Sequence, residues 1–446
     1  MTTFLHALQI DSDKCRAKLN CLRVCPTNAI RVRQGKAEIN STLCIDCGEC
    51  ITACKEGAIQ PLTDTWDTVE KYPYKVAIPA PTLYGQFPLA VSPKDIADGL
   101  LAIGFDEVYD LSVETELINR AIRDYLKEYK GPLPVISSTC PVIVRLIQVS
   151  YPDMVRQILP IFPPREIAGW EMKAKVSAEK GIPPEDIGAI YISPCPAKLV
   201  SIKQPAEDAK SYLDVGIGIK DIYNPLLAAI TKRLNRKNGE PSGRDAHFSI
   251  RSRSYLRMAH TGGISRAVRQ THSISVAQLQ HVIHVFEDIE KGKIKNAEFL
   301  ECYSCTSGCV GGPLTVDKRF VVRSKIQSLI NEIKKTDKEL EEEVARRYVK
   351  GRYLISQQIK PRPTSKRTGD LSDRIKQVKT REIYRKIFPG IDCGLCGAPT
   401  CEEFAGDVAV GDAKPTECIF VSDDRLKVLR ELYDLNEGSL PEDKNS

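Results

Sequence analysis

Long apolar runs are missing from this chain of 446 residues. No uninterrupted apolar stretch reaches ~18 residues, which is the length that a membrane-spanning helix needs. The first residues, Met1 to His6, show no basic region followed by an apolar one, so no export signal is expected. The formal charge of +6 is small for this length and argues against nucleic-acid binding. We therefore expect a cytoplasmic protein without membrane or nucleic-acid partners.

Cysteine, by contrast, is abundant and clustered. The chain has 16 cysteines, and without an export signal such clusters indicate metal ligands before disulfides. Oxygen-sensitive metal clusters favour an anaerobic host. The length and the apolar content allow two to four domains, with at least one sizeable core.

Two cysteine groups stand near the N-terminus. The spacing Cys44-x2-Cys47-x2-Cys50-x3-Cys54 is that of bacterial ferredoxins, in which the fourth cysteine reaches the other cluster. The earlier group has Lys18 where the second cysteine belongs. This stretch resembles a two-cluster ferredoxin domain of α+β type, with a hairpin between the two groups. Because the last cysteine of each group binds the other cluster, one [4Fe-4S] cluster has a complete set of ligands: Cys25, Cys44, Cys47 and Cys50. An incomplete set remains for the second cluster: Cys15, Cys21 and Cys54. The incomplete group could hold a three-iron cluster, a four-iron cluster with a non-cysteine ligand, or nothing.

The middle of the chain alternates between strand and helix patterns. Three short apolar runs predict buried parallel strands: 75–79, 133–138 and 187–193. Helical segments lie between them, which indicates an α/β domain with parallel sheets: 92–101, 113–130 and 141–150. Cys140 and Cys195 each follow such a strand, at the end where sites of open parallel sheets lie. A third segment, Leu300 to Pro313, places Cys305 and Cys309 where both can reach one metal centre. These four cysteines could ligate one cubane cluster.

Further elements are expected around this core. They are a strand-to-helix turn with paired glycines at 259–265, a strand at 282–286 and one long surface helix at 319–350. The glycine pair either serves packing or lines a cofactor pocket with backbone amides.

The last cysteine group follows a stretch rich in charge. Residues 359–385 contain prolines and many charges, so they predict an exposed linker. The spacing Cys393-x2-Cys396-x4-Cys401-x16-Cys418 indicates an iron-sulfur or zinc site. Its surroundings resemble the small [4Fe-4S] domain of corrinoid iron-sulfur proteins, which favours iron. A charged, helix-like tail is expected after Ile419.

Three segments of the middle region resemble the signatures of [FeFe]-hydrogenases: Ser-Ser-Thr-Cys140-Pro, Ser-Pro-Cys195-Pro-Ala-Lys198 and Glu301-Cys-Tyr-Ser-Cys305-Thr-Ser-Gly-Cys309. The resemblance implies that the four cysteines hold the [4Fe-4S] part of an H-cluster. Cys309 would also bridge to a two-iron subsite with CO, CN and azadithiolate ligands. Lys198 would donate a charge-assisted hydrogen bond to a cyanide. The resemblance further implies H2 and protons as substrates, maturation enzymes for the two-iron subsite, and two to three additional iron-sulfur clusters.

Several positions depart from the family pattern. Thr139 replaces the cysteine that passes protons to the bridgehead amine, and a hydroxyl releases its proton far less readily than a thiol near neutral pH. Four other replacements lie near the cluster segments: Ser193 and Tyr303 for methionines, Ser201 for a glutamate and Ile143 for a tryptophan. The proton route is therefore expected to be broken and turnover slow. Cys302 and Glu301 are the candidates for proton transfer, and the alternative is that Cys302 is a small packed residue.

This combination resembles the divergent sensory hydrogenases, in the branch without a PAS domain. It implies four segments: a ferredoxin-like domain at 1–66, an H-cluster domain at 67–358, a linker at 359–385 and a [4Fe-4S] domain at 386–446. The expected function is slow, reversible oxidation of H2 to protons and electrons, for sensing or redox signalling through ferredoxin or another redox protein. The alternatives are iron-sulfur assembly or electron transfer on a hydrogenase-like fold without the two-iron subsite.

Overall fold

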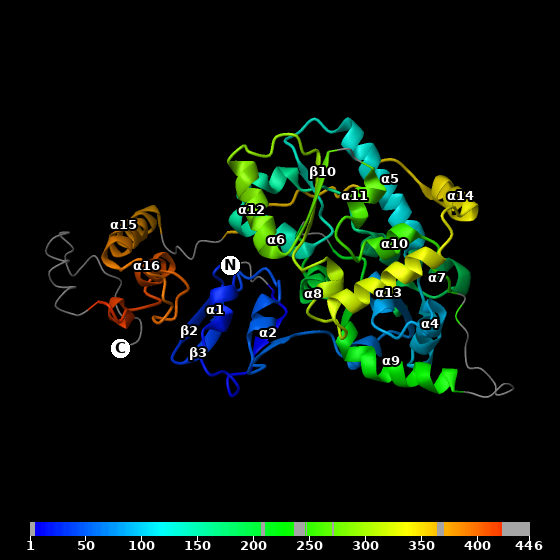
Figure 1. Ribbon diagram of the computed structural model, residues 1–446, viewed down its shortest axis with the longest axis horizontal. Coiled ribbons are helices and arrows are strands. Elements are labelled where there is room, and N and C mark those ends of the chain that lie inside the picture. The colour runs from blue at the N-terminus through cyan, green and yellow to red at the C-terminus, as the bar shows by residue number, and fades with distance from the viewer. Residues whose placement is uncertain are drawn as a thin grey trace.

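The computed structural model describes residues 5–206, 210–235, 246, 248–269, 272–363 and 370–421. Figure 1 shows a small N-terminal domain between a large central α/β domain and a C-terminal helical module. The predicted fold class is confirmed. Within the described ranges, no helix is long and apolar enough to cross a membrane. The tail expected after Ile419 lies outside the described residues from position 422 onward.

The N-terminal domain consists of two antiparallel strand pairs and two short helices. The pairs are β1 (Leu8–Ile10) with β4 (Ile59–Pro61), and β2 (Ile30–Arg33) with β3 (Lys36–Ile39). The β2–β3 pair is the predicted hairpin, and it turns at Gly35 with a φ of 75°. Each cysteine group contains one helix: α1 (Asn20–Val24) and α2 (Glu49–Ala53).

A four-stranded parallel sheet forms one half of the central domain. Its order is β6-β5-β8-β9, with the bounds Glu107–Val108, Tyr74–Pro79, Ile187–Ser193 and Val215–Gly218. Every residue of β8 is buried, which shows that both faces of the sheet are covered. The helices of this half are α3 (Trp66–Val69), α4 (Pro93–Ala102), α7 (Pro164–Lys180), α8 (Pro196–Lys203) and α9 (Ile219–Leu234).

A three-stranded parallel sheet forms the other half, in the order β10-β11-β7. The bounds are Ser273–Ala277, Phe299–Tyr303 and Val135–Ile136. The neighbouring helices are α5 (Ser112–Glu128), α6 (Pro141–Ser150), α10 (Arg253–Arg257), α11 (Gly263–Val268) and α12 (Leu279–Glu290). The cysteine-bearing segments follow β7, β8 and β11, so three strand ends converge as the sequence predicts for two of them.

Three expected elements were wrong. Residues 282–286 belong to α12, where Val282 and Phe286 are buried one helical turn apart. The glycine pair at 262–263 connects α10 to α11, so it follows a helix and not a strand. The long helix expected at 319–350 is two helices, α13 (Arg319–Glu332) and α14 (Lys338–Arg347).

The C-terminal module packs α15 (Leu371–Ile387) against α16 (Cys401–Ala409). Much of the expected linker 359–385 is therefore helix. Asp370 caps α15 by accepting a hydrogen bond from the backbone of Asp373, and the apolar side of α15 buries Tyr384 and Ile387 in the core of the module.

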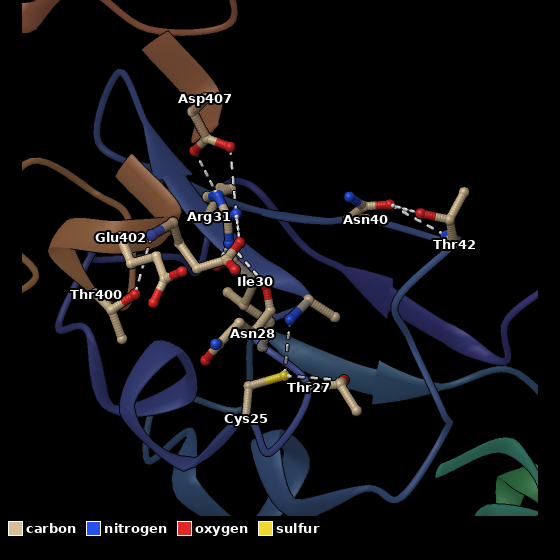
Figure 2. Close-up of polar contacts among 12 residues, drawn as sticks. Cys25, Thr27, Asn28, Ile30, Arg31, Asn40, Thr42, Thr400, Glu402 and Asp407 are labelled. Atoms are coloured by element: carbon tan, nitrogen blue, oxygen red, sulfur yellow. Dashed lines mark hydrogen bonds and ion pairs between the residues drawn. The ribbon is translucent and has the colours of Figure 1, made fainter. Parts of the chain in front are cut away.

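The module docks on the β2–β3 hairpin of the N-terminal domain (Figure 2). Arg31 Nε lies 2.6 Å from Asp407 Oδ2, and Arg31 Nη2 lies 2.7 Å from Glu403 Oε2. The Val32 amide donates to the Gly397 carbonyl at 2.8 Å. The side chains of Arg31 and Asp407 are only 9% and 6% exposed, so this ion pair is largely desolvated.

Candidate metal centre

Four cysteines from three chain segments meet beside the two sheets. Cys140 and Cys195 are the N-cap residues of α6 and α8, where the helix dipole favours negative charge. Cys305 and Cys309 lie on the loop after β11. Burial raises the pKa of the Cys305 thiol well above its usual value, and the other three cysteines add to the shift. The structure thus brings the four predicted ligands close enough together for each of the other three to influence the pKa of Cys305.

Lys198 lies beside these cysteines, one turn into α8. Its Nζ is 3.2 Å from Cys309 Sγ and 3.9 Å from Cys195 Sγ. Burial alone would lower the pKa of Lys198, but the negative sulfurs of Cys195 and Cys309 raise it well above its usual value. The spacing of three residues in a helix places Lys198 and Cys195 on one face. The lysine is therefore a buried cation beside the sulfurs of two predicted ligands.

Glycines let the backbone of the Cys305–Cys309 loop come close to its neighbours. Gly308 has a φ of 94°, and a Cβ there would meet the Ala259 carbonyl oxygen at 2.8 Å. At Gly263 a Cβ would lie 2.0 Å from the Arg257 carbonyl oxygen. Gly263 thus serves close packing, whereas Gly262 supplies a φ of 84° at the turn that leads into α11.

A cavity of about 460 Å³ of empty space opens beside Cys309. Its wall includes Thr139, Lys198, Arg165, Tyr191, Met258 and Thr82. The Thr82 hydroxyl is buried without a hydrogen-bond partner among the described residues, and such a group calls for a bound acceptor. Cysteine sulfur, an ammonium and an unpaired hydroxyl together fit an anionic metal group with hydrogen-bond acceptors.

In the N-terminal domain, the cysteines of the predicted complete group line one cavity of about 320 Å³ of empty space: Cys25, Cys44, Cys47 and Cys50. Burial, with Cys25 as the next cause, raises the pKa of the Cys50 thiol to about 12. The Ala29 amide donates to Cys25 Sγ at 3.2 Å. The thiols are thus arranged for a metal group whose binding would displace their protons.

The incomplete group also comes together. Burial raises the pKa of Cys21, and Cys54 and Cys15 contribute to the shift. Lys18, which stands at the missing cysteine position, pairs instead with Glu56 at the surface, with its side chain 59% exposed. The lysine therefore leaves the fourth ligand position of this group without a protein thiol.

The C-terminal cysteines surround the core of their module: Cys393, Cys396, Cys401 and Cys418. Burial raises the pKa of the Cys396 thiol, and Cys418 and Cys393 add to the shift. Asp392 fixes the loop by accepting a hydrogen bond from the Cys401 amide at 2.7 Å. In the part of the chain that the structure describes, no group of three or more ligating side chains is placed for a single metal ion.

Three family models match parts of this chain. Residues 74–278 match the family model of the iron only hydrogenase large subunit, C-terminal domain. The central domain belongs to the iron-only hydrogenase family. The matched stretch of this hydrogenase domain contains Cys140, Cys195 and Lys198 and ends before Cys305. Residues 7–55 match a 4Fe-4S dicluster domain, and residues 388–420 match an Fe-S cluster model.

Two curated relatives are hydrogenases. NADP-reducing hydrogenase subunit HndD of Solidesulfovibrio fructosivorans is 25% identical over 373 residues, which cover 68% of this chain and 63% of that protein. Iron hydrogenase 1 of Clostridium pasteurianum is 24% identical over 260 residues, which cover 49% of this chain and 44% of that protein. The chain thus spans less than two thirds of either relative.

The chain is also similar to an iron-sulfur assembly factor and to a solved hydrogenase structure. Cytosolic Fe-S cluster assembly factor nar1 of Aspergillus flavus is 24% identical over 197 residues, which cover 44% of this chain and 31% of that protein. A solved variant of [FeFe]-hydrogenase HydA1 from Chlamydomonas reinhardtii aligns with 64% of this chain and 90% of its own, at 18% identity and a TM-score of 0.45. The chain is thus similar to an assembly factor as well as to hydrogenases.

Arg165, which stands in no sequence motif, lies near two of the replacements noted in the sequence, Ser201 and Thr139. Arg165 Nη2 donates to Ser201 Oγ at 3.3 Å, and Arg165 also lines the cavity that contains Thr139. The Ser137 hydroxyl donates to Thr139 Oγ1 at 3.2 Å. Arg165 therefore links Ser201 to the cavity that contains Thr139.

Glu301 and Cys302 lie on opposite faces of β11. The amides of Ile264 and Ser265 donate to the Glu301 carboxylate at 3.1 and 2.9 Å, which caps the start of α11. Burial raises the pKa of the Glu301 carboxyl and, to a larger extent, of the Cys302 thiol. Cys302 packs in the core with Leu300 and Ile136. Among the described residues, neither belongs to the lining of the cavity beside Cys309.

The substitution Cys302→Ala is expected to leave any H2-dependent activity within a factor of about two, because the thiol packs in the core and lies outside the cavity lining. Its cost is a small loss of packing, of about 1 kcal/mol. Activity per matured protein and thermal unfolding check both parts. A fall in activity of about 10²-fold, the scale of general acid-base catalysis, would show that the thiol transfers protons.

The N-terminal domain contacts the hydrogenase domain through its complete cysteine group. Asp46, between Cys44 and Cys47, forms an ion pair of 2.5 Å with Arg145 of α6, and both side chains are buried. A Cβ at Gly48 would meet the Pro313 ring at 2.7 Å. The cysteine loop of the N-terminal domain therefore lies against α6, which begins at Cys140, and against the chain that follows Cys309.

Proposed function

We propose that the chain is a slow [FeFe]-hydrogenase that responds to H2 in the cytoplasm and passes electrons to ferredoxin or another redox or signalling protein. The observation that carries the proposal is the position of Lys198. A buried ammonium beside Cys195 and Cys309, at the wall of a cavity, is costly unless an anionic group balances it. The thiols of the cluster sites must lose protons on binding metal, and that loss supplies the anions.

In this proposal Cys140, Cys195, Cys305 and Cys309 hold the [4Fe-4S] part of an H-cluster. The two-iron subsite, when bound, supplies an open iron at which H2 is split. Lys198 orients that group through a charge-assisted hydrogen bond. The Thr82 hydroxyl is a further donor toward the cavity.

The same residues explain why turnover is slow. The Thr139 hydroxyl holds its proton far more tightly than a thiol would, and it already accepts a hydrogen bond from Ser137. Beyond it, Arg165 and Ser201 take the place of a titrating carboxylate. A slow reaction that still responds to H2 suits sensing better than bulk hydrogen metabolism.

The domain contacts favour an order for the other iron-sulfur groups. The complete group touches the hydrogenase domain through Asp46 and Arg145, and the C-terminal module touches the opposite hairpin through Arg31 and Asp407. The C-terminal module is therefore the candidate output end, with the cysteine sets of the two smaller domains as the electron carriers. Separate maturation enzymes would supply the two-iron subsite.

Infrared spectroscopy tests the proposal. After maturation with the two-iron subsite, we expect CO and CN bands that change under H2, and the variant Lys198→Ala should lose most of these bands because the charged donor is gone. Iron content and visible absorption serve as controls for the remaining clusters. An iron-sulfur assembly factor would show the cubane absorption without CO or CN bands, and a pure electron carrier would show no response to H2.

A further inference from the structure

A second, larger cavity lies on the other side of α10 from the cysteine site. It encloses about 1,720 Å³ of empty space, counting its opening to solvent. Its walls come from α5, α10, α11, α14 and the segment between α13 and α14. The residues that carry charge in this lining are Glu116, Arg120, Arg123, Asp124, Lys127, Arg251, Arg253, Arg257, Arg266, Arg269, Lys334, Lys335, Asp337 and Glu341.

The charge of this cavity is strongly positive. Ten of its lining side chains are basic and four are acidic. The net charge of the lining is therefore +6, which equals the formal charge of the entire chain. A concave surface with one sign of charge focuses the field and attracts ligands of the opposite sign.

Most of the acidic side chains in the wall are already engaged. Asp337 accepts two hydrogen bonds of 2.9 Å from Arg251, Asp124 accepts one from Tyr348 at 2.8 Å, and Glu116 accepts one from Ser252 at 2.7 Å. These carboxylates already accept hydrogen bonds from neighbouring side chains, so they neutralise the remaining arginines and lysines less effectively.

Three arginines are left without such partners. In the described part of the chain, no hydrogen bond or ion pair joins the side chain of Arg257, Arg266 or Arg269 to another residue. Burial lowers the pKa of Arg257, and the charges of Arg266 and Arg253 lower it further. Arg257 thus lies close enough to Arg266 and Arg253 to be repelled by them, and a bound anion would relieve that repulsion.

We propose that this cavity binds a small ligand that carries two or more linked phosphate groups. Guanidinium groups bind phosphate oxygens in a bidentate fork, and several converging arginines need more than one phosphate to be neutralised. The described lining contains no aromatic ring, so recognition rests on the phosphate chain rather than on a stacked base.

A ligand bound in this cavity would affect the cysteine loop through the short segment 257–259. Arg257 and Gly263 line the cationic cavity, whereas the next residue, Met258, lines the cavity beside Cys309. The Val310 amide donates to the Ala259 carbonyl at 3.2 Å. A ligand that holds Arg257 therefore restrains the segment that supports the loop of Cys305 and Cys309.

Titration calorimetry on the full chain tests the site with inorganic triphosphate as the probe. We expect saturable binding that is at least tenfold weaker in Arg257→Gln/Arg266→Gln, because two fork donors are lost. A second variant, Lys334→Gln/Lys335→Gln, changes two exposed residues of the rim and should weaken binding in the same direction. The matched control is Arg381→Gln, which changes an arginine of α15 that pairs with Glu402 and does not line the cavity, so this variant should bind as the parent protein does.

Orthophosphate and adenosine triphosphate complete the experiment. Orthophosphate should bind at least tenfold more weakly than triphosphate if linked phosphates are required. Equal affinity for triphosphate and the nucleotide supports recognition of the phosphate chain alone, and tighter nucleotide binding supports the same site with an added base contact. The proposal is overturned if triphosphate does not bind, if Arg381→Gln weakens it as much as the cavity variants, or if orthophosphate binds equally well.

Discussion

The substitution Thr139→Cys is expected to raise the rate of H2 oxidation by on the order of 10²-fold, the lower end of what a positioned general acid or base contributes. Thr139 lines the cavity beside Cys309, so a thiol at this position faces the same space. A cysteine thiol has an ordinary pKa of about 8.5, which lets it exchange protons near neutral pH. The rate is measured with matured protein and an artificial electron acceptor.

Thr139→Ser is the matched control, because it keeps a hydroxyl and removes only a methyl group. Its rate should stay close to that of the parent protein. The double variant Thr139→Cys/Ser201→Glu should exceed Thr139→Cys, since it also introduces a titrating group beside Arg165. If Thr139→Cys shows normal CO and CN bands but no faster turnover, proton transfer at this position does not limit the rate.

Asp407→Asn is expected to loosen the C-terminal module from the N-terminal domain. The change leaves the largely buried Arg31 with Glu403 as its remaining carboxylate partner. Removing one partner of a buried pair costs about 3 kcal/mol. This loss lowers the equilibrium constant for docking of the module by roughly 10²-fold. The Val32 amide donates across the interface to Gly397, so its hydrogen exchange should become faster by a similar factor.

Glu402→Gln provides the control for that experiment. Glu402 is the neighbour of Glu403 in α16, but its carboxylate pairs with Arg381 at the surface, with side chains 56% and 37% exposed. Exposed pairs contribute little, so exchange at Val32 should stay unchanged. Unfolding of the module must be excluded by circular dichroism. Unchanged protection of Val32 in a folded Asp407→Asn would show that the ion pair does not hold the interface.

The ligand-bearing segments could be predicted because their information is local. A cysteine after an apolar run, as at Cys140 and Cys195, marks a strand end. The spacing of Cys195 and Lys198 marks one helical face. The errors arose where a pattern is ambiguous: Val282 and Phe286 lie in a short apolar run that periodicity alone cannot assign to strand or helix.

The remaining features depend on pairs that the chain separates widely. Arg31 and Asp407 are 376 positions apart, and Arg165 meets Ser201 across 36. Arg31, Asp407 and Arg165 stand in no distinctive spacing, and their charges are ordinary among the 64 basic and 58 acidic residues. Only the packed domains reveal which charges are buried and therefore matter.

The first and last parts of this chain touch, although the hydrogenase domain separates them in sequence. Docking of the C-terminal module on the β2–β3 hairpin is thus an intramolecular event, governed by an effective concentration that for short tethers is on the order of millimolar. An interface of modest intrinsic affinity then stays closed in the resting protein. A loss of a few kcal/mol at Arg31 or Asp407 shifts this equilibrium toward the undocked C-terminal module, without any separate partner leaving.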